Sequence, residues 1–106
     1  GRIGPMGSLL LMQLDAMQPC NIQALATAMG RDNSQLTRLT RDLEAKGVLK
    51  REPSPEDRRA TLLSLTEEGR TFLHEAKAVL NLVVEDVAKD LSTKEAATLI
   101  ELLKKL

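Results

Sequence analysis

The chain has 106 residues, the usual size of one domain, and its 15 basic side chains balance 15 acidic ones. Apolar residues make up 42% and charged residues 28%, as in folded globular proteins, and no apolar run approaches the roughly 20 residues of a membrane span. A single cysteine excludes an internal disulfide and fits a reducing compartment, and a single histidine argues against a zinc site. We therefore expect one cytoplasmic domain with no membrane partner, metal or cofactor.

Aromatic side chains are almost absent, with one Phe and no Trp or Tyr. Modules that bind single-stranded nucleic acid stack bases on several aromatic rings, so the composition disfavours this class. Charge is unevenly spread: residues 31–59 hold eight basic and six acidic side chains, whereas residues 60–106 hold six and eight. A polyanion would therefore meet the middle of the chain.

The first predicted element is a short helix from Leu9 to about Met17, with Ser8 as its cap. Glycine and proline make residues 1–7 poor helix material, and we expect them to be disordered or foreign to the native chain. Pro19 then interrupts the chain.

Two helices follow. Asn21 is a good N-cap for a helix over residues 22–29, and Gly30 can take the left-handed conformation that ends it. Asp32 is the N-cap of the next helix, which we expect over residues 33–46.

The pattern then changes to short strands. Residues 48–52 and 60–65 are strand candidates, and the polar, proline-containing loop 53–59 lies between them. Two neighbouring strands joined by such a loop indicate a β-hairpin.

The rest of the chain is helical. Thr66 caps a helix over residues 67–90, and Ser92 with Glu95 forms a capping box that begins a last helix over residues 93–106. Apolar residues cover too wide an arc of this last helix for one packing face, so the surplus needs a partner. The predicted fold class is mainly α with a small β-hairpin.

The helix pair across Gly30 has the form of a helix-turn-helix. Apolar side chains can pack the two helices together, which leaves polar and basic residues on the outer face of the second. Arginine can make two hydrogen bonds to guanine, glutamine can do the same to adenine, and a helix fits the major groove. The candidate major-groove residues are Ser34, Gln35, Thr37, Arg38 and Arg41. The alternative is an ordinary helical hairpin with a solvated polar face.

The loop of the predicted hairpin carries Arg58 and Arg59, with Asp57 beside them. A narrow minor groove concentrates negative potential and attracts a guanidinium. Asp57 does not suit DNA, but its carboxylate can orient an arginine. The alternative is a solvated turn whose ion pair contributes little.

Several short motifs follow one another along the chain from the second helix onward. They are Leu25-Ala26, Gly30, Leu36-Thr37-Arg38, Leu43-Glu44, Lys46-Gly47, Asp57-Arg58-Arg59-Ala60 and Leu65-Thr66-Glu67-Glu68-Gly69. Together they resemble the MarR family of winged helix-turn-helix transcriptional regulators, over about residues 8–106. The stretch 57–69 is the most specific part of the resemblance.

The resemblance implies that different segments of the chain have different functions. A DNA-binding domain would span residues 8–66, with a recognition helix at 33–46 and a wing at 48–65, and residues 67–106 would be dimerisation helices. Arg59 would match the family's wing arginine and Asp57 its acidic partner. Family members commonly repress genes, and many release DNA on binding a small ligand or on cysteine oxidation, so a small-molecule effector is a candidate partner.

The chain departs from the family pattern in three places. No long helix precedes Ser8, where the family has one that contributes to its dimer. Phe72 is the single aromatic residue, which disfavours an aromatic-lined effector pocket. Cys20 has no basic neighbour in the sequence to lower its pKa, so we expect a buried residue rather than a redox sensor.

The sequence thus predicts a cytoplasmic, homodimeric regulator, most simply a repressor, that binds a pseudo-palindromic site in double-stranded DNA. It holds no phosphate-binding loop and no catalytic set of side chains, so we predict that the protein is not an enzyme. The alternative, from a different class, is a winged-helix module that binds other proteins and no DNA.

Overall fold

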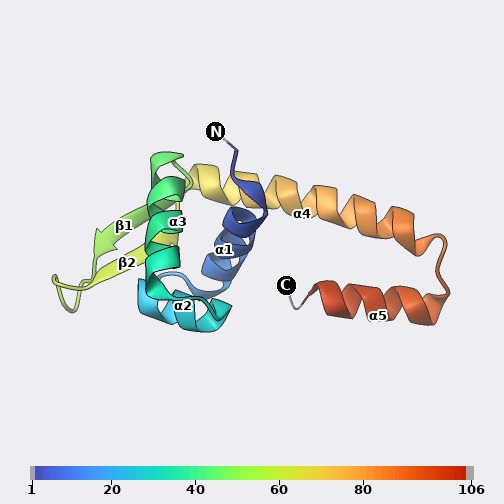
Figure 1. The fold of residues 1–106 in the computed structure, drawn as a ribbon. Coiled ribbons are helices and arrows are strands. Elements are labelled where there is room, and N and C mark those ends of the chain that lie inside the picture. The colour runs from blue at the N-terminus through green and yellow to red at the C-terminus, as the bar shows by residue number, and fades with distance from the viewer. Residues whose placement is uncertain (1, 105–106) are drawn as a thin grey trace. The chain divides into compact units, whose positions relative to one another are not determined.

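A computed structural model describes residues 2–104, apart from the side chains of Ala88 and Leu103. The chain forms two units, residues 1–73 and residues 74–106. The elements run in the order α1 (Gly4–Met17), α2 (Ile22–Met29), α3 (Asn33–Ala45), β1 (Leu49–Pro53), β2 (Thr61–Leu65), α4 (Glu67–Ala88) and α5 (Thr93–Leu103) (Figure 1). The predicted class, mainly helical with one antiparallel hairpin, is confirmed.

The N-terminus differs from the prediction. Helix α1 begins at Gly4, because Pro5 lies in its first turn, where a missing N–H costs no hydrogen bond. Ser8 is therefore not a cap; its hydroxyl donates to the Gly4 carbonyl within the helix at 2.8 Å. Gly7 is buried, and a Cβ there would lie 3.2 Å from the Leu43 side chain, so α1 approaches α3 closely at this point. The expectation of disorder was wrong for residues 4–7.

The predicted caps of α2 and α3 are confirmed. Asn21 Oδ1 accepts from the Ala24 amide at 2.8 Å, and Asp32 Oδ1 accepts from the Gln35 amide at 2.9 Å. Gly30 ends α2 with φ +65°, a conformation that glycine adopts without a steric penalty. The tight turn between the two helices therefore follows from local sequence signals.

One leucine-rich core holds the first unit together. Every helix and strand of that unit contributes to it, and burying each leucine side chain stabilises the fold by about 1.5–3 kcal/mol. The buried leucines are Leu10, Leu11, Leu14, Leu25, Leu36, Leu43, Leu49, Leu63, Leu65 and Leu73. On α4 the core contains Leu73, whereas the neighbouring Phe72 is only half-buried.

The hairpin is fastened to the core at its inner strand. Cys20, between α1 and α2, pairs with Leu63 of β2 through two backbone hydrogen bonds of 3.2 and 2.7 Å. The Gln18 side chain accepts from the Leu65 amide at 2.9 Å. Strand β1 then pairs with the other side of β2, with Leu49 opposite Leu65 and Arg51 opposite Leu63.

A second joint fixes the start of α4. Thr66 Oγ1 donates to the Gly47 carbonyl at 2.6 Å and accepts from the Gly69 amide at 3.0 Å, which confirms Thr66 as the cap. A Cβ at Gly69 would overlap the Val48 carbonyl oxygen, so this position admits only glycine without a shift of the backbone. The first turn of α4 is thereby tied to the turn that follows α3.

The second unit contains α4 from His74 onward and α5. The predicted capping box is present: Glu95 donates its amide to Ser92 Oγ at 3.2 Å, and the Ser92 amide donates to Glu95 Oε1 at 3.1 Å. Helix α4 ends at Ala88, two residues before the predicted end, and residues 105–106 of the predicted last helix lie outside the described residues. Across residues 2–104, the structure contains no helix long and apolar enough to cross a membrane.

Candidate nucleic-acid interface

The outer face of α3 presents a row of polar and basic side chains. Leu36 and Leu43 point into the core, which turns Ser34, Gln35, Arg38 and Arg41 to solvent. Within the described part of the chain, Arg38 and Arg41 form no ion pair. Their guanidinium groups are therefore available to a partner outside the chain.

Two of the five predicted residues also have internal roles. Ser34 Oγ donates to Asp32 Oδ1 at 2.8 Å, and Thr37 Oγ1 donates to the Asn33 carbonyl at 2.7 Å. The pKa of Asp32 lies below its ordinary value, chiefly because the Gln35 amide bonds its carboxylate, with further help from Ser34 and Arg38. The charged side chain of Asp32 therefore stabilises the N-terminus of α3.

The hairpin loop projects Arg58 and Arg59 into solvent, and the Arg59 side chain is 94% exposed. Asp57 Oδ1 accepts from the Arg59 amide at 3.0 Å and lies 3.5 Å from its Nε. The Ser54 amide donates to the Ala60 carbonyl at 2.9 Å and closes the loop. The structure therefore brings Asp57 against Arg59, the contact expected from the sequence.

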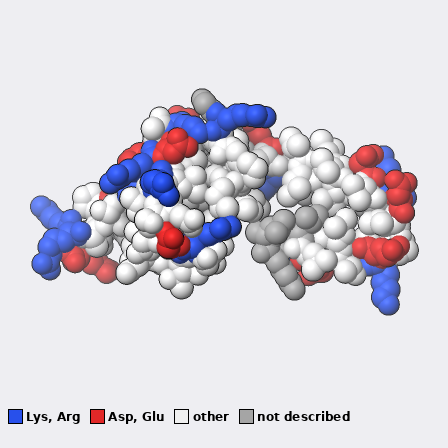
Figure 2. Space-filling view, viewed as in Figure 1, with Lys and Arg blue, Asp and Glu red and all other residues white. Residues whose placement is uncertain are grey.

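Basic side chains gather over α3 and at the tip of the hairpin, with acidic ones beside them (Figure 2). From His74 onward, α4 and α5 show a mostly uncharged surface in this view, apart from the turn that joins them (Figure 2). Both elements that carry the predicted site residues therefore present basic side chains to solvent in this view.

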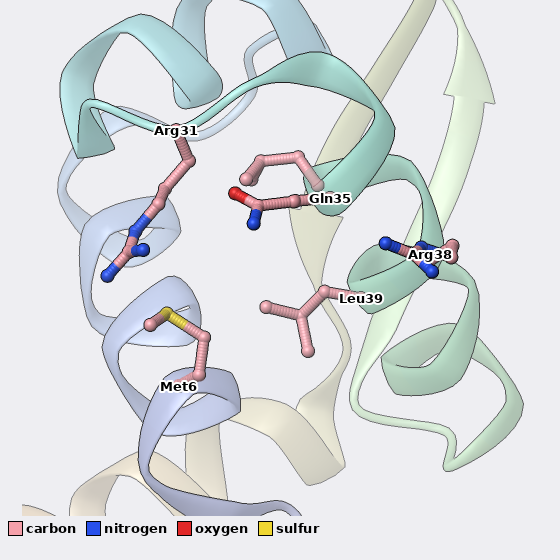
Figure 3. Close-up of a pocket in the computed structure, with 6 residues that line it drawn as sticks. Met6, Arg31, Gln35, Arg38 and Leu39 are labelled. Carbon is pink, nitrogen blue, oxygen red and sulfur yellow. The ribbon is translucent and has the colours of Figure 1, made fainter.

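Two basic residues outside the predicted set contribute to this region. Arg31, in the turn before α3, points with Gln35 and Leu39 toward Met6 across a hollow of about 420 Å³ beside the helix (Figure 3). Arg51 of β1 bonds two residues of α3, Thr40 and Glu44. Arg31 could have been found from its place in the helix-turn-helix, but the partners of Arg51 depend on tertiary packing.

The other two side chains considered, Cys20 and His74, show no sign of a redox or metal site among the described residues. Cys20 is buried, and burial raises the pKa of its thiol, which disfavours the reactive thiolate. His74 is exposed on α4, and residues 2–104 contain no group of His, Cys, Asp and Glu side chains that could hold a metal ion.

The comparisons with known proteins agree with this geometry. The MarR family model matches residues 8–61, from α1 to the start of β2. The chain belongs to the MarR family. Its members are winged-helix, DNA-binding transcriptional regulators rather than enzymes.

Solved structures extend the match over nearly the whole chain. Wild-type MarR from E. coli, in its apo form, is 28% identical, with a TM-score of 0.77 over 92% of this chain and 73% of that one. The transcriptional repressor CouR, bound to a 23-mer DNA duplex, is 30% identical, with a TM-score of 0.82 over 97% of this chain and 73% of that one. FabT from Streptococcus pneumoniae, solved in complex with DNA, is 23% identical with a TM-score of 0.76 over 92% of this chain and 68% of that one, and so shows the MarR fold alone.

Proposed function

We propose that the chain is a sequence-specific repressor that binds a pseudo-palindromic site in double-stranded DNA as a homodimer in the cytoplasm. The observation that carries the proposal is the exposed row on α3, where Gln35, Arg38 and Arg41 face solvent in a helix-turn-helix. Unpaired guanidinium groups beside an amide are the donors and acceptors that base edges and phosphates can pair with, which supports the proposal.

The recognition helix, α3, would enter the major groove. Arg38 and Arg41 suit guanine edges or phosphates, and Gln35 suits adenine. Ser34 and Thr37 donate their hydroxyl protons within the chain, so on DNA their oxygens would accept hydrogen bonds from base amino groups. These five residues would carry the sequence readout.

The wing, residues 48–65, would place Arg58 and Arg59 in the flanking minor groove. Asp57 holds the Arg59 backbone and lies beside its guanidinium, which limits the directions in which that side chain can point. Asp57 would act on Arg59 and leave the contact with DNA to the arginine.

Residues 8–66 would therefore form the DNA-binding domain, and residues 67–106 would join two copies. The apolar side chains of α4 and α5 remain exposed, among them Val79, Leu82 and Leu102 at 61%, 65% and 57%. A second copy of this surface would cover them, and its twofold symmetry would set two half-sites about 10 bp apart. CouR, a repressor 30% identical to this chain, was solved on a DNA duplex, which supports the same role here. Release by a small-molecule effector stays a prediction from the family.

Selection of duplexes from a random pool at near-physiological salt tests the proposal. We expect one inverted repeat to be recovered, and Arg38→Ala and Arg59→Ala to weaken binding to it by about tenfold or more. Lys89→Ala is the matched control: Lys89 lies in the second unit, pairs with Asp86 at 3.9 Å, and its loss should leave affinity unchanged.

Circular dichroism of each variant establishes that the loss of affinity is not a loss of fold. Recovery of no sequence by the folded chain would overturn the proposal and favour a module that binds proteins through the same fold.

A further inference from the structure

Strand β1 carries an arginine at a position that faces inward. Arg51 lies opposite Leu63, whose side chain is 1% exposed, and two residues from Leu49, which is fully buried. Side chains directly opposite each other in an antiparallel pair point to the same face of the sheet. Arg51 therefore points toward the core side of the hairpin, while its neighbour Lys50 points to the other face.

The Arg51 guanidinium reaches from the wing to the recognition helix. Its Nη2 donates to Thr40 Oγ1 at 2.8 Å, and its Nε lies 3.1 Å from Glu44 Oε1. Thr40 is fully buried, and its hydroxyl donates in turn to the Thr37 carbonyl at 3.1 Å. Two donors of one planar group thus hold two successive turns of α3, an arrangement with defined geometry.

The contact lies on the outer strand of the hairpin. Strand β2 is held by the Cys20 backbone and the Gln18 side chain, but β1 is the outer strand of the pair. A two-stranded hairpin is marginally stable alone, so the orientation of its outer strand depends on side-chain contacts. Arg51 supplies a contact of this kind between β1 and α3.

We propose that Arg51 is a positioning residue that fixes the wing relative to the recognition helix and thereby lets both read one DNA site at once. The inference rests on the proposed function, because it concerns the two elements assigned to the grooves. A wing held in place before binding does not lose further freedom when it meets the DNA. A loose wing must be ordered on binding, so Arg59 would contribute less to affinity.

A double-mutant cycle between residues 51 and 59 tests this coupling on the selected duplex. In the wild-type background, Arg59→Ala weakens binding by about tenfold, as expected for one specific contact. In the Arg51→Met background, we expect the same substitution to weaken it by no more than about threefold, although residues that share no partner normally act additively. Thr40→Val removes the acceptor without changing any charge, and we expect a shift in the same direction.

Lys50→Met is the matched control. It removes one positive charge from the same strand, but Lys50 is 49% exposed, pairs with Glu52 at 3.2 Å and, among the described residues, forms no hydrogen bond or ion pair with α3. The factor by which Arg59→Ala weakens binding in this background should stay within about twofold of the factor in the wild-type background. Wild type and Lys50→Met should bind the selected duplex whether or not Arg51 positions the wing, so they test the proposed function separately.

Two results would overturn the proposal. In the first, Arg59→Ala lowers the affinity for the selected duplex by the same factor, within about twofold, in the wild-type, Arg51→Met and Thr40→Val backgrounds. In the second, Arg51→Met weakens selected and random duplexes equally and lowers the salt slope by about one, while Thr40→Val has no effect. That result would make Arg51 a direct phosphate ligand. Far-ultraviolet circular dichroism and thermal unfolding establish that each variant is folded.

Discussion

The two units of the chain differ in how they treat their apolar side chains. In residues 2–73, ten leucines are buried in a common core that draws on every helix and strand of the unit. In residues 74–104, where the side chains of Ala88 and Leu103 are set aside, no residue is buried, and seven large apolar side chains are exposed. These are Val79, Leu80, Leu82, Val83, Val87, Ile100 and Leu102.

The difference indicates that the first unit is stabilised by its own core, whereas the second unit has apolar surface that a partner could cover. The first unit can hold its shape through its own core, so its polar outer surface is free to meet DNA. The second unit has a capping box that marks the start of α5, but it buries little of its apolar surface alone. Monomeric proteins rarely leave contiguous apolar surface of this kind in water, so the second unit is suited to a second copy.

The largest effect should come from the core of the first unit. Leu43 is fully buried beside α1, and Leu43→Ala should lower the free energy of unfolding by about 2–5 kcal/mol, because it leaves a cavity that α1 cannot fill. Urea denaturation measures this loss. Thr27→Ala, on the exposed face of α2, is the control and should change the same quantity by no more than about 0.5 kcal/mol. Equal effects of the two substitutions would contradict the core described here.

A charge placed on the second unit should separate the copies without unfolding the first unit. Leu82 is 65% exposed, and Leu82→Asp should convert a dimer of about 23 kDa into the 11.6 kDa chain, because a carboxylate cannot be buried unpaired in an apolar interface. Affinity for the full inverted repeat should then fall by about 100-fold, since two linked contacts become one. Light scattering and a binding titration measure both changes.

Asn81→Asp adds the same charge to α4 at a polar position and should leave the dimer intact. A dimer that survives Leu82→Asp would place the interface elsewhere.

Cys20 offers a smaller test of the first unit. Burial raises the pKa of the thiol and covers its sulfur, so it should react with a neutral disulfide reagent at least about tenfold more slowly in the native protein than in urea. The rate is followed by absorbance at constant pH. Similar rates in the two states would show that the joint between Cys20 and β2 opens readily.

The smallest effect should come from the cap of α3. The folded state lowers the pKa of Asp32, so its contribution to stability is complete above the ordinary value of 3.8 and is lost as the pH falls through the lower folded-state value. Asp32→Asn keeps a good N-cap that does not titrate. The stability of the wild type relative to this variant should therefore decline between about pH 5 and pH 3, and a constant difference would contradict the assigned cap.

Local signals predicted much of the fold. Asn21, Gly30, Asp32, Thr66 and the Ser92–Glu95 pair mark helix ends through contacts within a few residues, and all of them have the expected geometry. The start of α1 was missed because Pro5, read as a breaker, is tolerated in a first turn. The polar loop 53–59 between two strand candidates likewise identified the hairpin.

The links between distant elements were not predictable in the same way. The contact from Arg51 to Thr40 requires the register of β1 against β2 and the rotation of α3 about its axis, and both are set by packing. By contrast, the exposed row on α3 follows from spacing in the sequence, and the pairing of Asp57 with Arg59 was implied by the resemblance to the MarR family. The candidate site was thus predictable in its surface residues, and not in the arginine that ties its two parts together.

The most direct test compares the selected inverted repeat with one of its half-sites, by measuring the mass of the protein–duplex complex and the affinity for each duplex. Two chains should bind the full repeat together, and the half-site should bind about 100-fold more weakly, because in the proposed function the first unit reads DNA and the second joins the copies. Binding of single chains to each half-site, independently and with equal affinity, would contradict this division of labour.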